Sequence, residues 1–404
     1  MADQVIFLIS LVTLAIAAAF SYWSTRISMI LSLAVLIVAS LSYFKMLPTL
    51  IFLVAFLNVL SLLALKSSQL KGIDYALVSF MLLATLLIFY TSDPAMLLAL
   101  FVAASAPTYI LIMIGERMNI DIGVKYITFM IFGTVLFILG AALLYYNFEH
   151  RSSLIYSLAM LSLITGLAIE VGIAPAHEWV PDVFSTADPV PVSIIASLAK
   201  FVPFLVAYKV ISATAVSETQ QLLFLIAIIA ALSMFVGNIG ALTTKDPART
   251  LGYSTVANMG YVLATFAAIN AGEYVYFAIA GGILQLFVNA FGKIGFFNSI
   301  KEGTSSTCSW LLSASFIGIP PLMGFWSKFL IIYSLVFSNY LWLAILLVLN
   351  SAISVPYYVR LARITGKGWK PNITNYVVLV ASLLMLITLI PPTWIVESVM
   401  QLRW

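Results

Sequence analysis

Apolar runs of about 17–25 residues follow one another along almost the whole chain, and the links between them are short. A run of this length spans the hydrocarbon core of a bilayer as an α-helix. Hydrophobic residues make up 63% of the 404 residues and charged residues 8%, whereas a soluble domain is about half apolar and about a quarter charged. Strands of a membrane barrel would show short alternating segments instead. The sequence therefore predicts an all-α polytopic membrane protein in a lipid bilayer.

We predict about fourteen transmembrane helices from these runs. The expected spans are 4–21, 28–44, 48–65, 74–91, 94–114, 126–146, 153–173, 190–211, 220–244, 251–270, 274–299, 308–336, 340–363 and 374–396. The first run has no basic region before it and no convincing cleavage site after it, so we interpret it as a retained helix and not as a signal peptide. The links leave no room for a soluble domain.

Basic residues in the links alternate by side, and positive residues favour the cytoplasm. The links after odd-numbered helices hold most of them, namely Arg26, Lys66, Lys71, Arg117, Lys125, Lys245, Arg249, Lys301, Arg360, Arg363, Lys367 and Lys370. The opposite links hold mainly Lys45, Arg151 and Arg403. The link between helices seven and eight departs from this trend, because it has Asp182 and Asp188 and no basic residue. We expect a multi-pass protein of the cell (plasma) membrane with both termini outside.

Two ionisable residues, Glu170 and Lys200, lie in apolar helical patterns on either side of a break at Gly172 and Pro175. A charge at membrane depth costs several kcal/mol and usually marks an ion or proton path. Non-helical backbone at that depth is tolerated only where it is buried in protein or lines a wet cavity. The sequence therefore predicts that helix seven is broken beside a functional site.

Helix twelve is interrupted in a similar way by Pro320 and Pro321, and Lys328 follows within two turns. Broken helices in corresponding places of two halves are typical of transporters. We infer two repeats, roughly helices four to eight and nine to thirteen. As domains we assign 1–92 to helices one to four, 93–212 to a first antiporter-like half, 213–365 to a second half and 366–404 to the last helix.

Burial and neighbouring charges move the pKa values of lysine and glutamate, so such groups can titrate near neutral pH and pass protons along a hydrated file. The candidate proton relay consists of Glu170, Lys200, Lys293 and Lys328. Alternatively, the lysines extend to the membrane interface, or Glu170 forms a structural pair with a lysine. His177 and Glu178, after the first break, either move protons or hold the broken segment together.

No cofactor is expected in this chain. The single cysteine, Cys308, excludes an internal disulfide and an iron–sulfur cluster. The two histidines, His150 and His177, have no metal-ligand spacing, so no metal site is predicted. There is no Gly-rich phosphate loop with its lysine, which argues against nucleotide chemistry. The net charge of +4 gives no indication of a nucleic-acid partner.

Several long motifs occur in the order of a known family. They are Lys125-Tyr126 with IFGTVLFILGAALLY, PAHEWVPDVFSTADPVPVSIIASLAK, GNIGAL with LGYSTVANMGYVLA, NAFGKIGFF, GIPPLMGFWSKFL and NSAISVPYYVRL. Over roughly residues 95–365 the chain resembles the antiporter-like proton-channel subunits. These are shared by respiratory complex I, membrane-bound hydrogenases and multisubunit sodium/proton antiporters. Within this family the chain is most similar to the N subunits of NADH-quinone oxidoreductases.

The resemblance implies fourteen helices with two inverted five-helix repeats, each with a broken helix, and a central polar axis that links two half-channels. By resemblance, Lys200 matches the family's central lysine on helix eight and Lys328 the lysine on broken helix twelve. Lys293 matches the helix-eleven lysine of the larger relatives. His177 matches the histidine after the break in helix seven.

Three positions depart from the family pattern. Glu170 stands where the family normally has a lysine, Val102 where it has a glutamate on helix five, and Asn258 where many relatives have a histidine. Three interpretations follow for the first half. Glu170 takes over its proton relay, Glu170 pairs directly with Lys200, or the first half-channel is inactive.

The resemblance implies a proton-translocating membrane subunit of a respiratory NADH-quinone oxidoreductase assembly of the complex I type. Other membrane and redox subunits would be its partners and would carry out electron transfer. Two alternatives remain. The chain belongs to a membrane-bound hydrogenase or multisubunit Na+/H+ antiporter, or it is a non-conducting scaffold subunit.

Overall fold

The computed structural model describes residues 2–42, 45–65, 70, 72–114, 120–215 and 219–402, and within these ranges all regular structure is helical. The prediction of an all-α chain is therefore confirmed. Four of the basic residues used to predict orientation, Lys66, Lys71, Arg117 and Arg403, lie outside the described residues.

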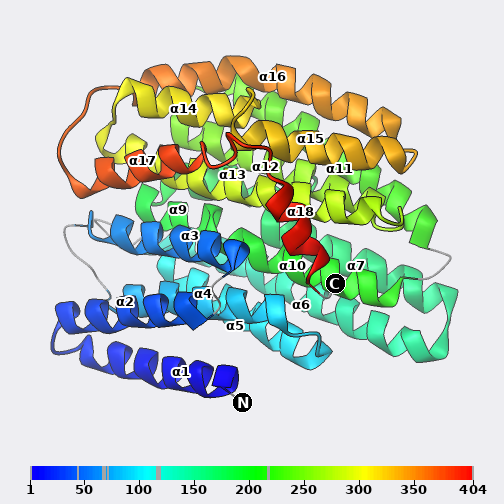
Figure 1. Cartoon of the computed structure of the whole chain (residues 1–404), viewed down its shortest axis with the longest axis horizontal. Coiled ribbons are helices and arrows are strands. Elements are labelled where there is room, and N and C mark those ends of the chain that lie inside the picture. The colour runs from blue at the N-terminus through cyan, green and yellow to red at the C-terminus, as the bar shows by residue number, and fades with distance from the viewer. Residues whose placement is uncertain are drawn as a thin grey trace.

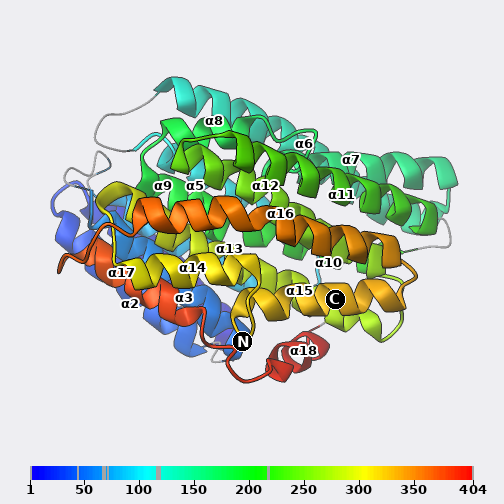
Figure 2. The ribbon, with the colours of Figure 1, turned by 90° about the horizontal axis from the view of Figure 1, so that it is seen from above.

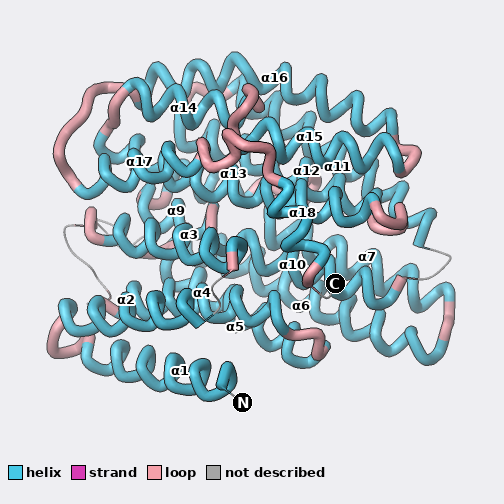
Figure 3. Tube along the Cα trace, in the orientation of Figure 1, coloured by secondary structure: helices cyan, strands magenta, loops and turns pink. Residues whose placement is uncertain are grey.

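Long helices run roughly side by side, and most loops lie at the two ends of the bundle (Figures 1 and 3). The elements are α1 (Ala2–Phe20), α2 (Thr25–Ser42), α3 (Met46–Leu62), α4 (Ile73–Tyr90), α5 (Pro94–Leu111), α6 (Ile120–His150), α7 (Ser153–Val171), α8 (Trp179–Thr186), α9 (Pro189–Ala196), the 3-10 turn η1 (Leu198–Lys200), α10 (Phe201–Thr214), α11 (Thr219–Thr243), α12 (Pro247–Ala264), η2 (Thr265–Ala268), α13 (Tyr274–Glu302), α14 (Ser306–Ile317), α15 (Met323–Phe337), α16 (Leu341–Thr365), α17 (Ile373–Leu384) and α18 (Thr393–Met400).

Eight helical spans in the described ranges are long and apolar enough to cross a membrane. They are Ile73–Tyr90, Pro94–Leu111, Ile120–His150, Ser153–Val171, Pro189–Thr214, Gln220–Thr243, Tyr274–Glu302 and Leu341–Thr365. Burial differs sharply among them. In the most apolar part of Pro189–Thr214, 94% of the residues are buried, and in that of α13 the buried share is 83%. In the corresponding parts of α6 and α16, only 39% of the residues are buried. Lys200 and Lys293 therefore lie in the two most buried of these spans, while α6 and α16 present wide apolar faces.

The view from above places α6, α7 and α8 on one side and α2, α3, α17 and α18 on the other (Figure 2). Helix α13 packs against α9, α12, α14, α15 and α17, so it joins the two sides. Lys293 lies in α13 itself, and the other three candidate relay residues come from elements that pack on this helix or on its neighbours.

Two predicted spans are wrong in detail. The span 374–396 is not one helix, because α17 ends at Leu384 and a separate α18 begins at Thr393. Pro391 and Pro392 lie between them and lack the N–H groups that a continuing helix needs. The span 190–211 is also divided, into α9, η1 and α10.

The ends of α7 and α14 have the same local construction. Each helix is followed by a glycine in the left-handed region, Gly172 at φ 80° and Gly318 at φ 95°. The next residue then donates its N–H back into the last turn, from Ile173 to Ala168 O at 2.8 Å and from Ile319 to Ala314 O at 3.0 Å. Glycine has no Cβ to oppose this conformation, so it ends the helix at a defined residue.

Candidate functional site

The carboxyl group of Glu170 lies buried in the last turn of α7. Thr134 of α6 donates its hydroxyl hydrogen to Glu170 Oε1. Tyr109 of α5 lies next in line, with its hydroxyl 3.3 Å from Thr134 Oγ1. When Glu170 is ionised, the threonine hydrogen is used by the carboxylate, so Tyr109 donates to Thr134. Three helices therefore converge on this one acid.

Lys200 binds the carbonyl end of α7. Its Nζ donates to the backbone oxygen of Glu170 at 3.1 Å and lies 4.8 Å from the centre of the Trp179 ring. Trp179 Nε1 donates to the neighbouring carbonyl, Ile169 O, at 2.9 Å. The last carbonyls of a helix lack helical partners and carry partial negative charge. The break after α7 therefore creates the binding place of the lysine.

Lys328 occupies an equivalent position at the end of α14. Its Nζ donates to Phe316 O at 2.8 Å and to Ile317 O at 3.0 Å. The ring of Tyr261 lies 5.2 Å from the same nitrogen. Both lysines thus combine the carbonyl end of a glycine-terminated helix with an aromatic face, where a cation is attracted by the ring quadrupole.

Lys293 is fully buried in α13. Its Nζ donates to Leu251 O at 2.6 Å and to Ser254 Oγ at 2.8 Å, both on α12. The Phe316 ring, whose own carbonyl binds Lys328, lies 5.4 Å away. Lys293 and Lys328 therefore both contact the same residue, Phe316.

A chain of side-chain hydrogen bonds leads from Ser254, the partner of Lys293, to Ser327, the residue before Lys328. Its links are Ser254–Tyr358 at 2.8 Å, Asn258 to Tyr358 at 3.1 Å, Gln285 to Asn258 at 2.6 Å and Ser327 to Gln285 at 2.5 Å. All of these side chains are buried. The chain thus connects Lys293 with Ser327 of α15 through side chains of α12, α13 and α16, and Lys328 Nζ itself binds Phe316 O and Ile317 O.

Apart from Asn258, which the sequence marked as a departure from the family pattern, these connecting residues were missed by reasoning from the sequence. Gln285 stands two helical turns before Lys293, which places both on one face of α13. An amide side chain in an apolar helix indicates a buried polar site, but less strongly than a charged side chain does. Tyr358 carries no comparable signal, because tyrosine is common in membrane helices.

The site corrects two alternatives. Lys200, Lys293 and Lys328 are at most 5% exposed, so none of them extends to a membrane interface. The hydrogen bond of Lys200 goes to the backbone of Glu170, and within the described ranges no carboxylate oxygen lies within 4.0 Å of any of the three. A direct Glu170–Lys200 ion pair is therefore wrong for this conformation.

The supporting residues proposed from the sequence lie at the edge of this site. His177 is partly exposed, and its Nδ1 lies 3.1 Å from Pro175 O within the same loop. Glu178, Pro175, Pro320 and Pro321 are exposed. The structure brings Lys200 to Glu170 and brings both Lys293 and Lys328 to Phe316, but it leaves His177 and Glu178 outside these two buried groups.

An ion-pair cluster holds the short helix α8, which follows the first break. Asp182 contacts Lys125 of α6 at 2.5 Å and Arg249 of α12 at 2.7 Å. Burial alone would raise the pKa of Asp182, but the hydrogen bonds and charges of Lys125 and Arg249 outweigh it and hold the pKa below its usual value. Asp182 thus ties α8 to two long helices.

We expect Asp182→Asn to destabilise the purified protein by less than about 1 kcal/mol, because the partners are more than one-third exposed and solvent screens such pairs. A lowered pKa means that the carboxylate stabilises the fold above its ordinary pKa of about 4 and loses this effect as the pH falls through the lowered value. Thermal unfolding in detergent should separate the two proteins at neutral pH and low salt. A difference that persists unchanged at 1 M salt would contradict an ionic origin.

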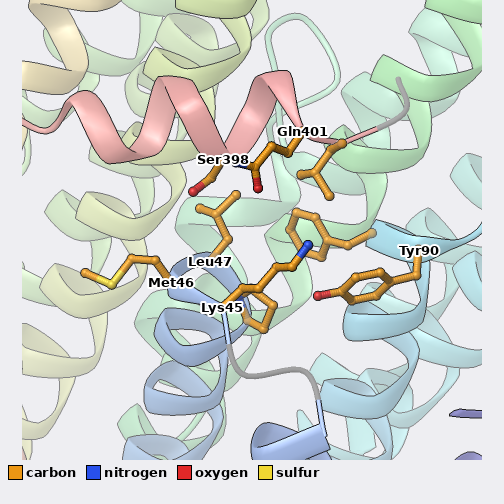
Figure 4. A pocket seen from close by; sticks show the side chains of 9 residues that line it. Lys45, Met46, Leu47, Tyr90, Ser398 and Gln401 are labelled. Carbon is orange, nitrogen blue, oxygen red and sulfur yellow. The ribbon is translucent and has the colours of Figure 1, made fainter. Parts of the chain in front are cut away.

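A separate cleft of about 220 Å³ opens between the start of α3, the end of α4 and α18 (Figure 4). It is lined by Lys45, Met46, Leu47, Pro48, Phe89, Tyr90, Ser398, Gln401 and Leu402. None of the candidate relay residues lines it, so it is not part of the buried site.

Comparison with known proteins gives the class of this fold and site. Residues 92–354 match the family model described as NADH:quinone oxidoreductase/Mrp antiporter, transmembrane. The chain belongs to this family. Every candidate relay residue lies inside the matched range.

Among curated relatives, the chain is 31% identical over 223 residues to NADH-quinone oxidoreductase subunit N 2 of Aquifex aeolicus, covering 50% of this chain and 45% of that protein. The first matched relatives are thus aligned over about half to two-thirds of their own length. Two solved structures share the fold. One is a chain of respiratory complex I from Thermus thermophilus, with a TM-score of 0.75, 21% identity and coverage of 98% of this chain and 99% of that one. The other belongs to an archaeal membrane-bound sulfane sulfur reductase, with a TM-score of 0.81, 18% identity and coverage of 99% and 96%.

Proposed function

We propose that this chain is a proton-translocating membrane subunit of a complex I-like NADH-quinone oxidoreductase. The observation that carries the proposal is the paired construction of two lysine sites. Lys200 and Lys328 each bind the carbonyl end of a helix that a left-handed glycine terminates. A cation held by helix carbonyls and an aromatic ring, with no carboxylate partner, can gain or lose a proton without breaking an ion pair.

In this proposal the relay runs from Glu170 to Lys200, Lys293 and Lys328. Helices α4 to α10 and α11 to α16 form two inverted repeats, each with one helix that a left-handed glycine ends. The matching ends of α7 and α14 support this division. The relay works in a cell membrane with both termini outside. Partner subunits carry out electron transfer, and their conformational or electrostatic change shifts the charge of Lys200.

A second candidate keeps the fold and changes the assembly. The family description includes Mrp antiporters, and the sulfane sulfur reductase chain has a TM-score of 0.81. The chain would then serve another redox complex or a sodium/proton antiporter with the same buried lysines. A scaffold that does not conduct is disfavoured, because three buried lysines without carboxylate partners destabilise a membrane protein and have no use in a scaffold.

The test is gentle extraction of the tagged chain from native membranes, followed by identification of the proteins that co-purify. We expect quinone-reductase subunits together with iron–sulfur proteins, because the chain resembles N subunits. Recovery of hydrogenase, sulfur-reductase or small antiporter subunits would move the chain to the second candidate. Recovery of the chain alone from intact membranes would contradict both.

A further inference from the structure

The span that carries Lys200 is broken one turn before the lysine. Ser197 has φ −110° and ψ −86°, outside the helical region. Lys200 N then donates to Ser197 O at 3.2 Å in a 3-10 turn, so Ala196 O loses its usual helical partner. Pro203 contributes to the break, because it has no N–H for Ala199 O. The backbone at 196–200 therefore needs other groups to fix its geometry.

Two fully buried asparagines supply these groups from opposite sides. Asn289 of α13, one turn before Lys293, donates Nδ2 to the free Ala196 O at 2.7 Å. Asn58 of α3 donates Nδ2 to Ser197 Oγ at 2.9 Å, and its Oδ1 accepts from Ser193 Oγ at 3.2 Å. Helices α3, α9 and α13 pack against one another, as Figure 1 shows.

The arrangement couples the break to the lysine geometrically. Lys200 is three residues beyond Ser197, and its Nζ must reach Glu170 O at 3.1 Å from this turn. A change in the backbone conformation at Ser197 would therefore move the Cα atom of Lys200, from which its side chain extends. Asn289 also leaves its buried Oδ1 without a partner in the described part of the protein, so one acceptor stays available between the two lysine-bearing spans.

We infer that Asn58 and Asn289 are positioning residues that hold the break at Ser197 and thereby set Lys200 on the carbonyl end of α7. The inference rests on the proposed function, since it assumes that Lys200 carries protons. It adds α3 to the relay, although α3 lies outside the matched range 92–354. An interhelical hydrogen bond in a membrane contributes little to stability, so the main effect of Asn58 is geometric.

A close control is present in the same pair of helices. Asn298 of α13 donates Nδ2 to Ser61 of α3 at 3.0 Å, and both residues are buried. This hydrogen bond joins α3 to α13 as Asn58 joins α3 to α9, but it does not touch the break or a lysine. Asn298→Leu and Asn58→Leu should therefore have similar effects on stability and different effects on proton transfer.

The experiment compares Asn58→Leu, Asn58→Gln, Asn298→Leu and Lys200→Met in the complete native complex reconstituted into liposomes. The rate of proton pumping, the number of protons pumped per electron and the amount of assembled complex are measured. We expect Asn58→Leu to slow proton transfer through this subunit about 10-fold, within the range by which a misplacement of about 1 Å slows a geometry-dependent step. Asn58→Gln keeps the amide donor and acceptor and should restore part of the loss.

The outcomes separate the inference from the proposed function. Loss of pumping in Lys200→Met and Asn58→Leu, with normal stoichiometry in Asn298→Leu, supports the inference. Loss in Lys200→Met with normal stoichiometry in Asn58→Leu overturns it and leaves the relay intact. If Asn58→Leu and Asn298→Leu reduce the amount of assembled complex equally and both pump with normal stoichiometry, the inference is also overturned, because Asn58 is then structural only. Normal pumping in Lys200→Met overturns the proposed function.

Discussion

Replacing Lys200 by methionine should slow proton transfer through this subunit by about 10²-fold or more, the lower limit of what a positioned acid–base group typically contributes. Methionine has similar length and fits an apolar setting, but it cannot carry a proton. Its thioether leaves Glu170 O at the end of α7 without the hydrogen bond at 3.1 Å. The measurement is the number of protons pumped per electron by the reconstituted complex.

Lys200→Arg distinguishes a proton carrier from a fixed charge. Arginine keeps a cation near the carbonyl end of α7 and the Trp179 ring, but it does not lose its proton in proteins. A relay that needs release of the proton should therefore fail with arginine as well as with methionine. Lys370, which is exposed, provides the control substitution Lys370→Met. Undiminished stoichiometry in Lys200→Met would remove Lys200 from the relay, and normal function of Lys200→Arg alone would reduce its role to a structural charge.

The sequence predicted the membrane class and most helix positions because the thickness of the bilayer, and not tertiary contacts, sets the length of each apolar run. The buried charges Glu170 and Lys200 were visible for the same reason, since a charge inside an apolar run is conspicuous. The partners of Lys200 were not visible. Its contact with Glu170 O depends on how α7 ends and on how η1 turns the chain, and both are tertiary properties.

The break at Ser197 shows where local signals were available but too weak. Pro203 is a helix breaker, and Ser197 hydrogen-bonds back to Ser193 O at 2.6 Å, which bends membrane helices. Both residues nevertheless stand inside a continuous apolar run, so the pattern predicted one helix. The asparagine that holds the break, Asn58, is more than a hundred residues away in the chain, and no local pattern connects the two.

Packing between α6 and α7 gives the second large expected effect, for Gly166→Leu. A Cβ added at Gly166 would lie 2.3 Å from Phe137 N and 2.7 Å from Gly133 O, which are backbone atoms of α6. Gly140 of α6 faces α7 in the same way, with its Cβ position 2.3 Å from Leu163 N. A backbone atom within a helix cannot move without the rest of the helix, so a larger side chain at Gly166 must push α6 and α7 apart. Small residues at such interfaces let membrane helices approach closely.

We therefore expect Gly166→Ala to destabilise the protein by about 1–3 kcal/mol, the usual cost of overpacking, and Gly166→Leu to abolish accumulation of the assembled complex. Separation of α6 from α7 would also break the hydrogen bond from Thr134 to Glu170, which is one turn beyond Gly166. Thr165→Leu is the matched control. Thr165 is the residue before Gly166 on α7 and is exposed, so the added side chain faces outward. Thermal unfolding in detergent and the yield of complex are measured. A Gly166→Leu protein that unfolds at the wild-type temperature would show that α6 and α7 are not held together by direct backbone contact.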